Sequence, residues 1–435
     1  MYQLDWVQQL VRRRRAGTRE RPAVQATVWY LGWTSCLTDI SSEMVNGILP
    51  LYLVGFLRLS PLQFGVIDGL YQGVSAVLRL AGGVISDRWQ RHKETAVAGY
   101  GLSAICKLGL LATGSSWPWL ASVIALDRTG KGLRTAPRDA LITRNSTPAS
   151  LGTSFGVHRA MDAAGALAGP LVAFLILGWA PERYDIIFVT SFCFAIVGLA
   201  VLVTFVDANA GGDAAANLGE AKAPRPSLMA TMALLMRVSG YGYLIVAASV
   251  LALATISDAF VYLTLQRRLQ FSPTVFPLLY VATSLVYMLL AVPAGRLADQ
   301  LGSRPVFLGG YGMLGIVYLA LLLPGTGAYG AVLGIIALGG YYAATDGVLM
   351  AIAGRVLPAA HTATGMAVLT TFTSLARFLS SVAFGWFWTA RDPAAAVRVF
   401  AVGLVVSIIL AAIALSRAQF APASINEGSS NHGGH

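Results

Sequence analysis

The sequence predicts an all-α membrane protein with twelve transmembrane helices arranged in two pseudo-symmetric six-helix bundles. Of its 435 residues, 56% are hydrophobic and 12% are charged, against roughly 25% charged residues in a typical soluble domain. Apolar runs of roughly 20 residues, long enough to cross the hydrocarbon core as a helix, recur along the chain. A short pattern of glycine, aspartate and basic residues also appears once in each half, which indicates an internal repeat.

The elements are expected in the following order. Residues 1–24 carry several arginines without the apolar stretch and cleavage site of a signal peptide, and are expected to form a cytoplasmic basic arm. Residues 207–237 are polar and rich in Ala and Gly, which favours a cytoplasmic linker between the halves. Residues 418–435 are expected to be a cytoplasmic tail.

The twelve spans are divided equally between the two halves. The first half, 25–206, is expected to hold spans near 25–56, 62–85, 94–113, 117–137, 153–178 and 185–206. The second half, 238–417, is expected to hold spans near 238–265, 274–296, 305–323, 327–350, 360–384 and 395–416.

The net charge of +11 is interpreted as a sign of how the chain is oriented in the membrane. It does not indicate a nucleic-acid partner, because the basic residues form short clusters between apolar runs. With both termini in the cytoplasm, about 19 Lys and Arg fall in cytoplasmic segments and about 6 outside, as the positive-inside rule requires. We therefore expect a multi-pass protein of the plasma membrane, monomeric and surrounded by lipid.

Cysteine usage and motifs argue against a cofactor or an enzyme active site. Cys36, Cys106 and Cys193 lie in apolar runs without CxxC spacing, so neither a disulfide framework nor a zinc site is expected. No Ser/His/Asp or Cys/His set is recognisable. We expect no cofactor and no bound metal.

The internal repeat lies after the second and eighth expected spans. It reads GxxxD followed by basic residues: Gly83, Asp87, Arg88 and Arg91 in the first half, and Gly295, Asp299 and Arg304 in the second. A small residue lets two helices approach, an aspartate caps or pairs at a helix end, and basic residues hold the loop at the cytoplasmic face.

This repeat resembles the loop between the second and third helices of the major facilitator superfamily, and the resemblance covers the whole chain. Arg128-Thr129-Gly130-Lys131-Gly132 resembles the family's RxxxG motif, although Lys131 stands where Gln is usual. Gly165, Gly169 and Pro170 resemble the GxxxGP motif of its drug/proton antiporters, although the second glycine pair that often follows is missing. The resemblance implies a secondary transporter, an association of Arg128 with proton coupling, and gating roles for the glycine motifs. The glycines and proline are equally consistent with simple close packing and a kink.

Ionisable residues inside the spans are the candidate functional residues, because each costs roughly 3 kcal/mol or more at mid-bilayer. Asp39, Glu43 and Asn46 share one face of the first span. Two carboxylates this close repel each other. They are expected to carry a proton or a cation, or else to pair statically with Arg79 or Lys107.

The fourth and fifth spans carry further charge. Arg128, Lys131 and Arg134 form a stripe that cannot face lipid, so it is expected to line a cavity or the cytoplasmic mouth. Alternatively the helix ends early and Arg134 and Arg138 lie in a solvated loop. Arg159 and Asp162, beside His158, form an i, i+3 pair that serves either as a proton relay or as a self-satisfied ion pair.

The second half is poorer in charge, with Asp258, Asp346 and Arg377 inside its expected spans. Energy coupling is therefore expected in the first half. The second half is expected to supply cavity wall, for instance through Phe260, Tyr262, Tyr341 and Tyr342, although membrane aromatics also serve as packing or interfacial belts.

The function expected from these features is alternating-access transport of a small solute, with proton-coupled efflux of a small organic compound or drug favoured. An exporter of divalent transition metal using Asp39, Glu43 and the tail residues His432 and His435 is an alternative. Uptake symport is less favoured, and a membrane enzyme or receptor least. The substrate is left open, because family membership does not specify cargo.

Overall fold

The computed structural model describes residues 24–89, 91–147, 150–207, 234–236, 238, 240–325, 327–358 and 362–417, with only the backbone at 79–89 and 363. All regular elements in this part of the chain are helical. The basic arm (residues 1–23), most of the linker and the tail with His432 and His435 lie outside the described residues.

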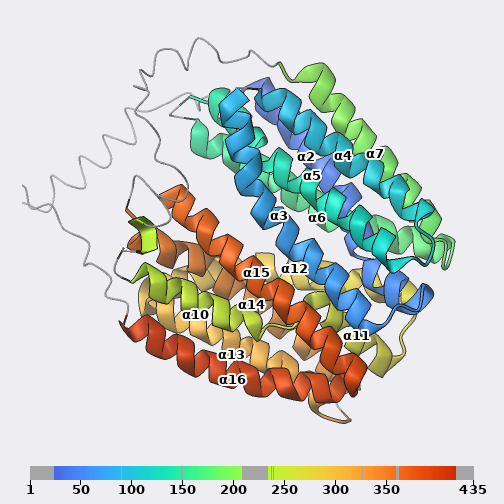
Figure 1. Cartoon of the computed structure of the whole chain (residues 1–435), viewed down its shortest axis with the longest axis vertical. Coiled ribbons are helices and arrows are strands. Elements are labelled where there is room, and N and C mark those ends of the chain that lie inside the picture. The colour runs from blue at the N-terminus through green and yellow to red at the C-terminus, as the bar shows by residue number, and fades with distance from the viewer. Residues whose placement is uncertain are drawn as a thin grey trace, which may run out of the picture.

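The first half is a bundle of long helices, drawn in blue to green in Figure 1. Its elements are α2 (Ala26–Asn46), the short π-helix η1 (Leu51–Phe56), α3 (Pro61–Trp89), α4 (His92–Ala112), α5 (Trp117–Arg144), α6 (Leu151–Trp179) and α7 (Tyr184–Phe205).

The second half is a similar bundle, drawn in yellow-green to red in Figure 1. Its elements are α10 (Tyr241–Leu253), α11 (Asp258–Leu269), the short 3₁₀-helix η2 (Pro273–Val275), α12 (Phe276–Leu301), α13 (Ser303–Leu322), α14 (Gly327–Val356), α15 (Thr362–Ala390) and α16 (Pro393–Arg417).

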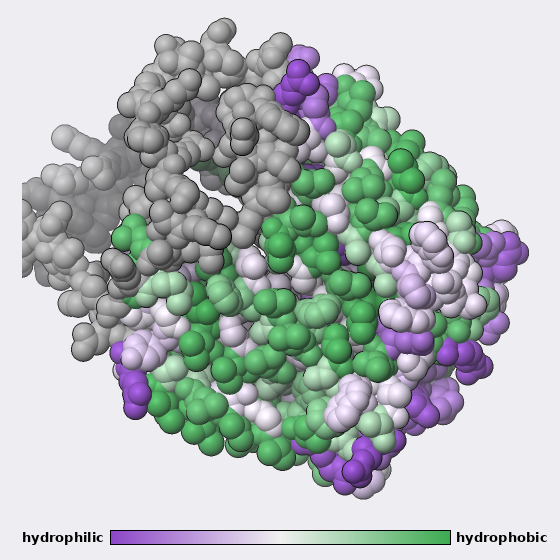
Figure 2. Space-filling model, viewed as in Figure 1, coloured by the Kyte–Doolittle hydropathy of each residue, from purple (hydrophilic) through white to green (hydrophobic). Residues whose placement is uncertain are grey.

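The outer surface matches a lipid environment. Nine helical segments in the described part are long and apolar enough to cross a membrane, with α10 and α11 counted together as one segment. Large apolar side chains such as Trp179 and Leu289 point outward with exposed fractions of 81% and 72%. Figure 2 shows apolar residues covering much of the visible face, with polar residues gathered near its edges. Helices α2 and α5, which carry several charged residues, are not among the nine.

Several expected spans differ from the observed helices, and the first is divided into α2, which ends at Asn46, and the π-helix η1 at Leu51–Phe56. The fourth does not end early, because α5 continues to Arg144 and keeps Arg134 buried with 4% exposure. The seventh is interrupted, because α10 ends at Leu253 and α11 begins at Asp258.

The GxxxGP segment packs α6 tightly against α2. A methyl group added at Gly169 would lie 2.7 Å from both the Ile40 carbonyl oxygen and the Met44 amide nitrogen, and one at Gly165 would overlap the Cys36 backbone. The close packing predicted for these glycines is confirmed, and it fixes the position of the helix that carries Asp39 and Glu43.

The two halves meet where α3 begins and α15 ends. A methyl group at Gly65 would lie 2.5 Å from the Ser381 carbonyl oxygen, and the Leu62 amide donates a hydrogen bond to the Thr389 hydroxyl at 3.0 Å. The Phe64 ring packs edge-on against Phe260, with centroids 4.9 Å apart. This junction therefore closes the interface between the halves at one end of the molecule.

Candidate functional site

A cavity of about 620 Å³ lies between the two halves. Its charged wall residues come from both bundles: Asp68, Arg128 and Lys131 from the first, and Asp258, Asp346 and Arg377 from the second. A polar, charged cavity enclosed by helices that expose apolar side chains elsewhere is the principal candidate site.

The acidic face of α2 is paired with the basic stripe of α5. The Glu43 carboxylate accepts a hydrogen bond from the Asn46 amide at 3.0 Å and lies 3.8 Å from the Lys131 ammonium. Asp39 lies 3.7 Å from the Arg134 guanidinium. Both Asn46 and Lys131 line the cavity, so the acidic face is connected to it.

A second, more deeply buried group of charges is centred on Asp127. Its carboxylate accepts a hydrogen bond from Lys107 at 2.9 Å and also pairs with Arg128. The Arg128 guanidinium carbon lies 3.9 Å from the centre of the Tyr71 ring, a cation–π contact. Lys107 therefore pairs with α5 and not with α2, while the side chain of Arg79 lies outside the described part.

The charges of α6 are arranged differently from the expected i, i+3 pair. Asp162 lies 3.7 Å from Arg138 and 3.5 Å from His158, whereas Arg159 is exposed. His158 is in turn 3.0 Å from the Ser35 hydroxyl of α2. Asp162 thus joins α5 and α6, an arrangement that the spacing of Arg159 and Asp162 does not predict.

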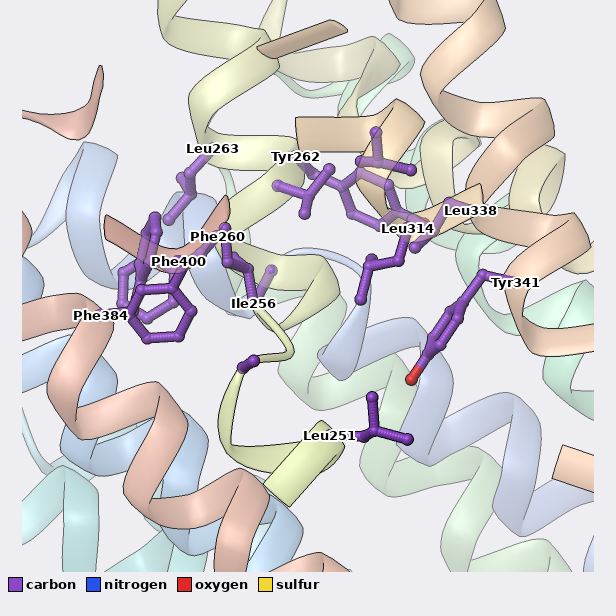
Figure 3. Packing of buried hydrophobic residues seen from close by; sticks show 14 of the residues in the cluster. Leu251, Ile256, Phe260, Tyr262, Leu263, Leu314, Leu338, Tyr341, Phe384 and Phe400 are labelled. Atoms are coloured by element: carbon purple, nitrogen blue, oxygen red, sulfur yellow. The ribbon is translucent and has the colours of Figure 1, made fainter. Parts of the chain in front are cut away.

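In the second half, Tyr342 is the only one of the four named aromatics that lines the cavity, where its hydroxyl donates to Asp258 at 2.6 Å. Phe260, Tyr262 and Tyr341 are fully buried and belong to the packed core seen in Figure 3. Tyr341 nevertheless reaches the cavity indirectly, because its hydroxyl is 3.4 Å from the Arg377 guanidinium.

The break between α10 and α11, seen between Leu251 and Ile256 in Figure 3, lies on the cavity wall. Free backbone groups in a membrane need partners. The Tyr318 hydroxyl donates to the Ala254 carbonyl and accepts from the Ile256 amide, both at 2.7 Å. Ser380 donates to the Thr255 carbonyl at 2.6 Å. These bonds hold the irregular segment in place and leave Asp258 at the first position of α11.

Asp68 on α3 is a cavity residue that sequence analysis missed. Its carboxylate accepts a hydrogen bond from Ser381 on α15, so it joins the two halves. An aspartate within the apolar run VIDGL was a sufficient signal, since an ionisable residue inside a span requires a partner or a function.

The second-half copy of the GxxxD pattern does not line the central cavity. In the second half, Asp299 on α12 lies 3.7 Å from Arg355 on α14, and both side chains are largely exposed. Arg304 lines a small pocket beside Arg355, and Gly295 has open space around it. In the first half, the side chains of Gly83, Asp87 and Arg88 are outside the described part, and Arg91 directly precedes α4 and is exposed.

Metal-binding side chains do not gather in groups of three or more His, Cys, Asp or Glu within the described residues. Asp39 and Glu43, named for the metal-exporter alternative, are therefore not part of such a group in this part of the chain, and His432 and His435 lie outside it.

A family model and a related sequence both match this chain to the same protein family. The family model "Major Facilitator Superfamily" matches residues 31–265 and 242–432. An uncharacterized MFS-type transporter of Methanocaldococcus jannaschii is 32% identical over 299 residues, which cover 67% of this chain and 71% of that protein. The multidrug resistance protein MdtH of Photorhabdus laumondii is 29% identical over 181 residues, 41% of this chain and 42% of that protein.

Solved structures share the fold. A nucleoside transporter, NupG, superposes with a TM-score of 0.72 at 13% identity, covering 90% of this chain and 99% of that one. A peptide transporter, POT, in complex with sulfate gives a TM-score of 0.72 at 17% identity, covering 90% and 94%.

Proposed function

The chain belongs to the major facilitator superfamily and is a multi-pass membrane transporter, not an enzyme; we propose that it exports a small organic compound in exchange for protons. The observation that carries this proposal is the cavity walled by charged residues of both halves. A site between two bundles is exposed alternately to each side when one bundle rocks against the other. We further propose a monomer in the plasma membrane with both termini in the cytoplasm.

Asp39 and Glu43 are the proposed proton-binding groups. Their side chains keep exposed fractions of 19% and 23%, and their cationic partners stand 3.7 and 3.8 Å away. Asp127 differs, because its carboxylate is 9% exposed and bonded to two cations. A loosely paired, partly accessible carboxylate can lose its partner when it binds a proton, whereas a tightly bound one is held in place.

The basic partners supply the second part of the mechanism. When Asp39 or Glu43 is protonated, Arg134 or Lys131 loses its counter-charge and is free to pair elsewhere. Lys131 lines the cavity, so protonation at Glu43 changes the charge that a solute meets there. This links proton binding to solute release. The direction of transport is proposed from the partial similarity to MdtH, a multidrug resistance protein.

Proton flux in proteoliposomes tests this proposal. A thermal-stabilisation screen first supplies a binding compound, since a ligand that binds the folded state raises its unfolding temperature. With that compound and an imposed pH gradient, the wild-type protein is expected to show solute-dependent proton movement. Asp39→Asn and Glu43→Gln are expected to abolish proton movement while retaining solute exchange at equal pH.

Asp392→Asn is the matched control, because Asp392 is exposed before α16 and its side chain accepts a hydrogen bond from the Ala395 amide, a capping role that Asn also fills. Proton movement that persists in both Asp39→Asn and Glu43→Gln at the level of this control would remove the coupling claim.

A further inference from the structure

A smaller cavity of about 160 Å³ opens beside the central one, between α11, α12 and α14. Its wall consists of two carboxylates, four tyrosines and two hydroxyl residues, without any Lys, Arg or His among the described residues that line it. The lining residues are Asp258, Asp346, Tyr262, Tyr280, Tyr287, Tyr342, Thr283 and Ser284, which we call the tyrosine pocket. Four of them also line the central cavity, so the two spaces adjoin each other.

The carboxylates of the tyrosine pocket differ from those of the first half. Asp39, Glu43, Asp127 and Asp162 each have a basic nitrogen within salt-bridge distance. Within the described residues neither Asp258 nor Asp346 has one.

Arg377 is the cation on this side of the central cavity. Its guanidinium donates a hydrogen bond to the Tyr341 hydroxyl at 3.4 Å, and it lines the central cavity but not the tyrosine pocket. Asp258 is partly buried, and Asp346, which lines both cavities, is exposed. Two neighbouring carboxylates without a salt-bridge partner make this part of the wall negatively charged, which attracts a cationic ligand.

The tyrosines add a second preference. The Tyr280 ring packs edge-on against Tyr262, with centroids 4.6 Å apart, and the Tyr262 hydroxyl is bonded to Thr283 at 2.6 Å. Tyrosine rings beside a small space attract an organic ammonium through their faces. The same wall also offers oxygen atoms to a small inorganic cation, and sodium ion is therefore tested alongside the organic probes.

We propose that the tyrosine pocket binds the ammonium group of an organic cation while the remainder of the solute occupies the central cavity. This assignment rests on the proposed transport function and names its substrate class. The central cavity supplies an apolar surface for the remainder through Ala248, Ala252, Ile256, Leu349 and Met350. The volumes agree with this division, because the smaller space suits an ammonium with small substituents and the larger one the body of the molecule.

Three probes of similar size and different charge test the proposal on the purified full chain: phenethylammonium, 2-phenylethanol and phenylacetate. Phenethylammonium is expected to raise the thermal unfolding temperature most and to give a measurable Kd. Asp258→Asn and Asp346→Asn are each expected to weaken its binding about tenfold or more, the cost of losing a charged partner. Asp392→Asn is expected to bind it as the wild type does.

Tyr280 provides a test that leaves the carboxylates intact if the aspartate variants fail to fold. Tyr280→Phe keeps the ring and is expected to retain binding, whereas Tyr280→Leu removes it and is expected to weaken binding several-fold. Equal binding of phenethylammonium by Tyr280→Phe and Tyr280→Leu would refute a contribution of the Tyr280 ring to binding.

Better stabilisation by phenylacetate, 2-phenylethanol or sodium ion than by phenethylammonium would overturn the assignment, as would unchanged binding in folded Asp258→Asn. The transport proposal fails by a different result. If phenethylammonium binds as expected but causes no proton movement in proteoliposomes, the proposed ammonium site is supported and the proposed exchange of solute for protons is refuted.

Discussion

Replacing Asp127 with asparagine tests how the buried charges of the first half are balanced. Asp127 stands between Lys107 and Arg128, whose side chains are only 3% and 2% exposed. Asp127→Asn keeps the volume but leaves two buried cations without a counter-charge. Breaking a buried pair in this way costs about 3–5 kcal/mol.

Lys107→Met gives the comparison. It preserves most of the apolar stem and leaves Asp127 paired with Arg128, so only one charged hydrogen bond is lost, about 1.5–3 kcal/mol. The double variant removes one of the stranded cations, so its loss of stability is expected to be smaller than the sum of the single losses by about 1 kcal/mol or more.

Unfolding in mixed micelles, followed by tryptophan fluorescence, measures these differences. Asp185→Asn is the control, because it breaks an aspartate–arginine pair that is exposed near the start of α7 and is expected to leave the midpoint unchanged. The reasoning is refuted if Asp127→Asn unfolds at the same midpoint as Asp185→Asn. It is also refuted if the loss of stability in the double variant equals the sum of the losses in Asp127→Asn and Lys107→Met.

Three further outcomes are expected. Gly169→Ala should lower the free energy of unfolding by about 1–3 kcal/mol, because the new methyl group would lie 2.7 Å from the α2 backbone. Gly152→Ala on the same helix is the control, because Gly152 has open space around it, and it should raise or preserve the unfolding midpoint. Ser381→Ala should lengthen the distance between spin labels at the joined ends of α3 and α15, since it removes the bond to Asp68; an unchanged distance distribution would contradict a role in closure. Asp299→Asn should slow solute exchange in proteoliposomes without changing phenethylammonium affinity, because its partner lies outside the cavity; a weakened affinity would be inconsistent with this placement.

The site shows where prediction from sequence succeeds. The i, i+4 spacing of Asp39 and Glu43, with Asn46 three residues on, placed the three side chains on one helix face, and the Glu43–Asn46 hydrogen bond agrees with it. Spacing within one helix is a local property, so the helical repeat is enough to predict it.

Partners on other helices were not predictable in the same way. Lys107 was one of two partners considered for Asp39 and Glu43 in the static-pair alternative, and it pairs instead with Asp127. Asp162 was expected to pair with its neighbour Arg159 and instead meets Arg138 and His158. Each choice depends on how α2, α4, α5 and α6 are rotated against one another, and glycine contacts such as Gly169 against α2 set that rotation.

The sequence by itself determined that this chain is a helical membrane protein with an internal repeat and with charge concentrated in its first half, because hydrophobic length and local spacing are written along the chain. Only the tertiary structure decided which charges meet. It brought Asp68 to Ser381 across the two halves, interrupted the seventh span before Asp258, and gathered Asp258, Asp346 and four tyrosines into one pocket. The physical reason is that these contacts join residues far apart in sequence, and their energies depend on packing and desolvation that no local pattern records.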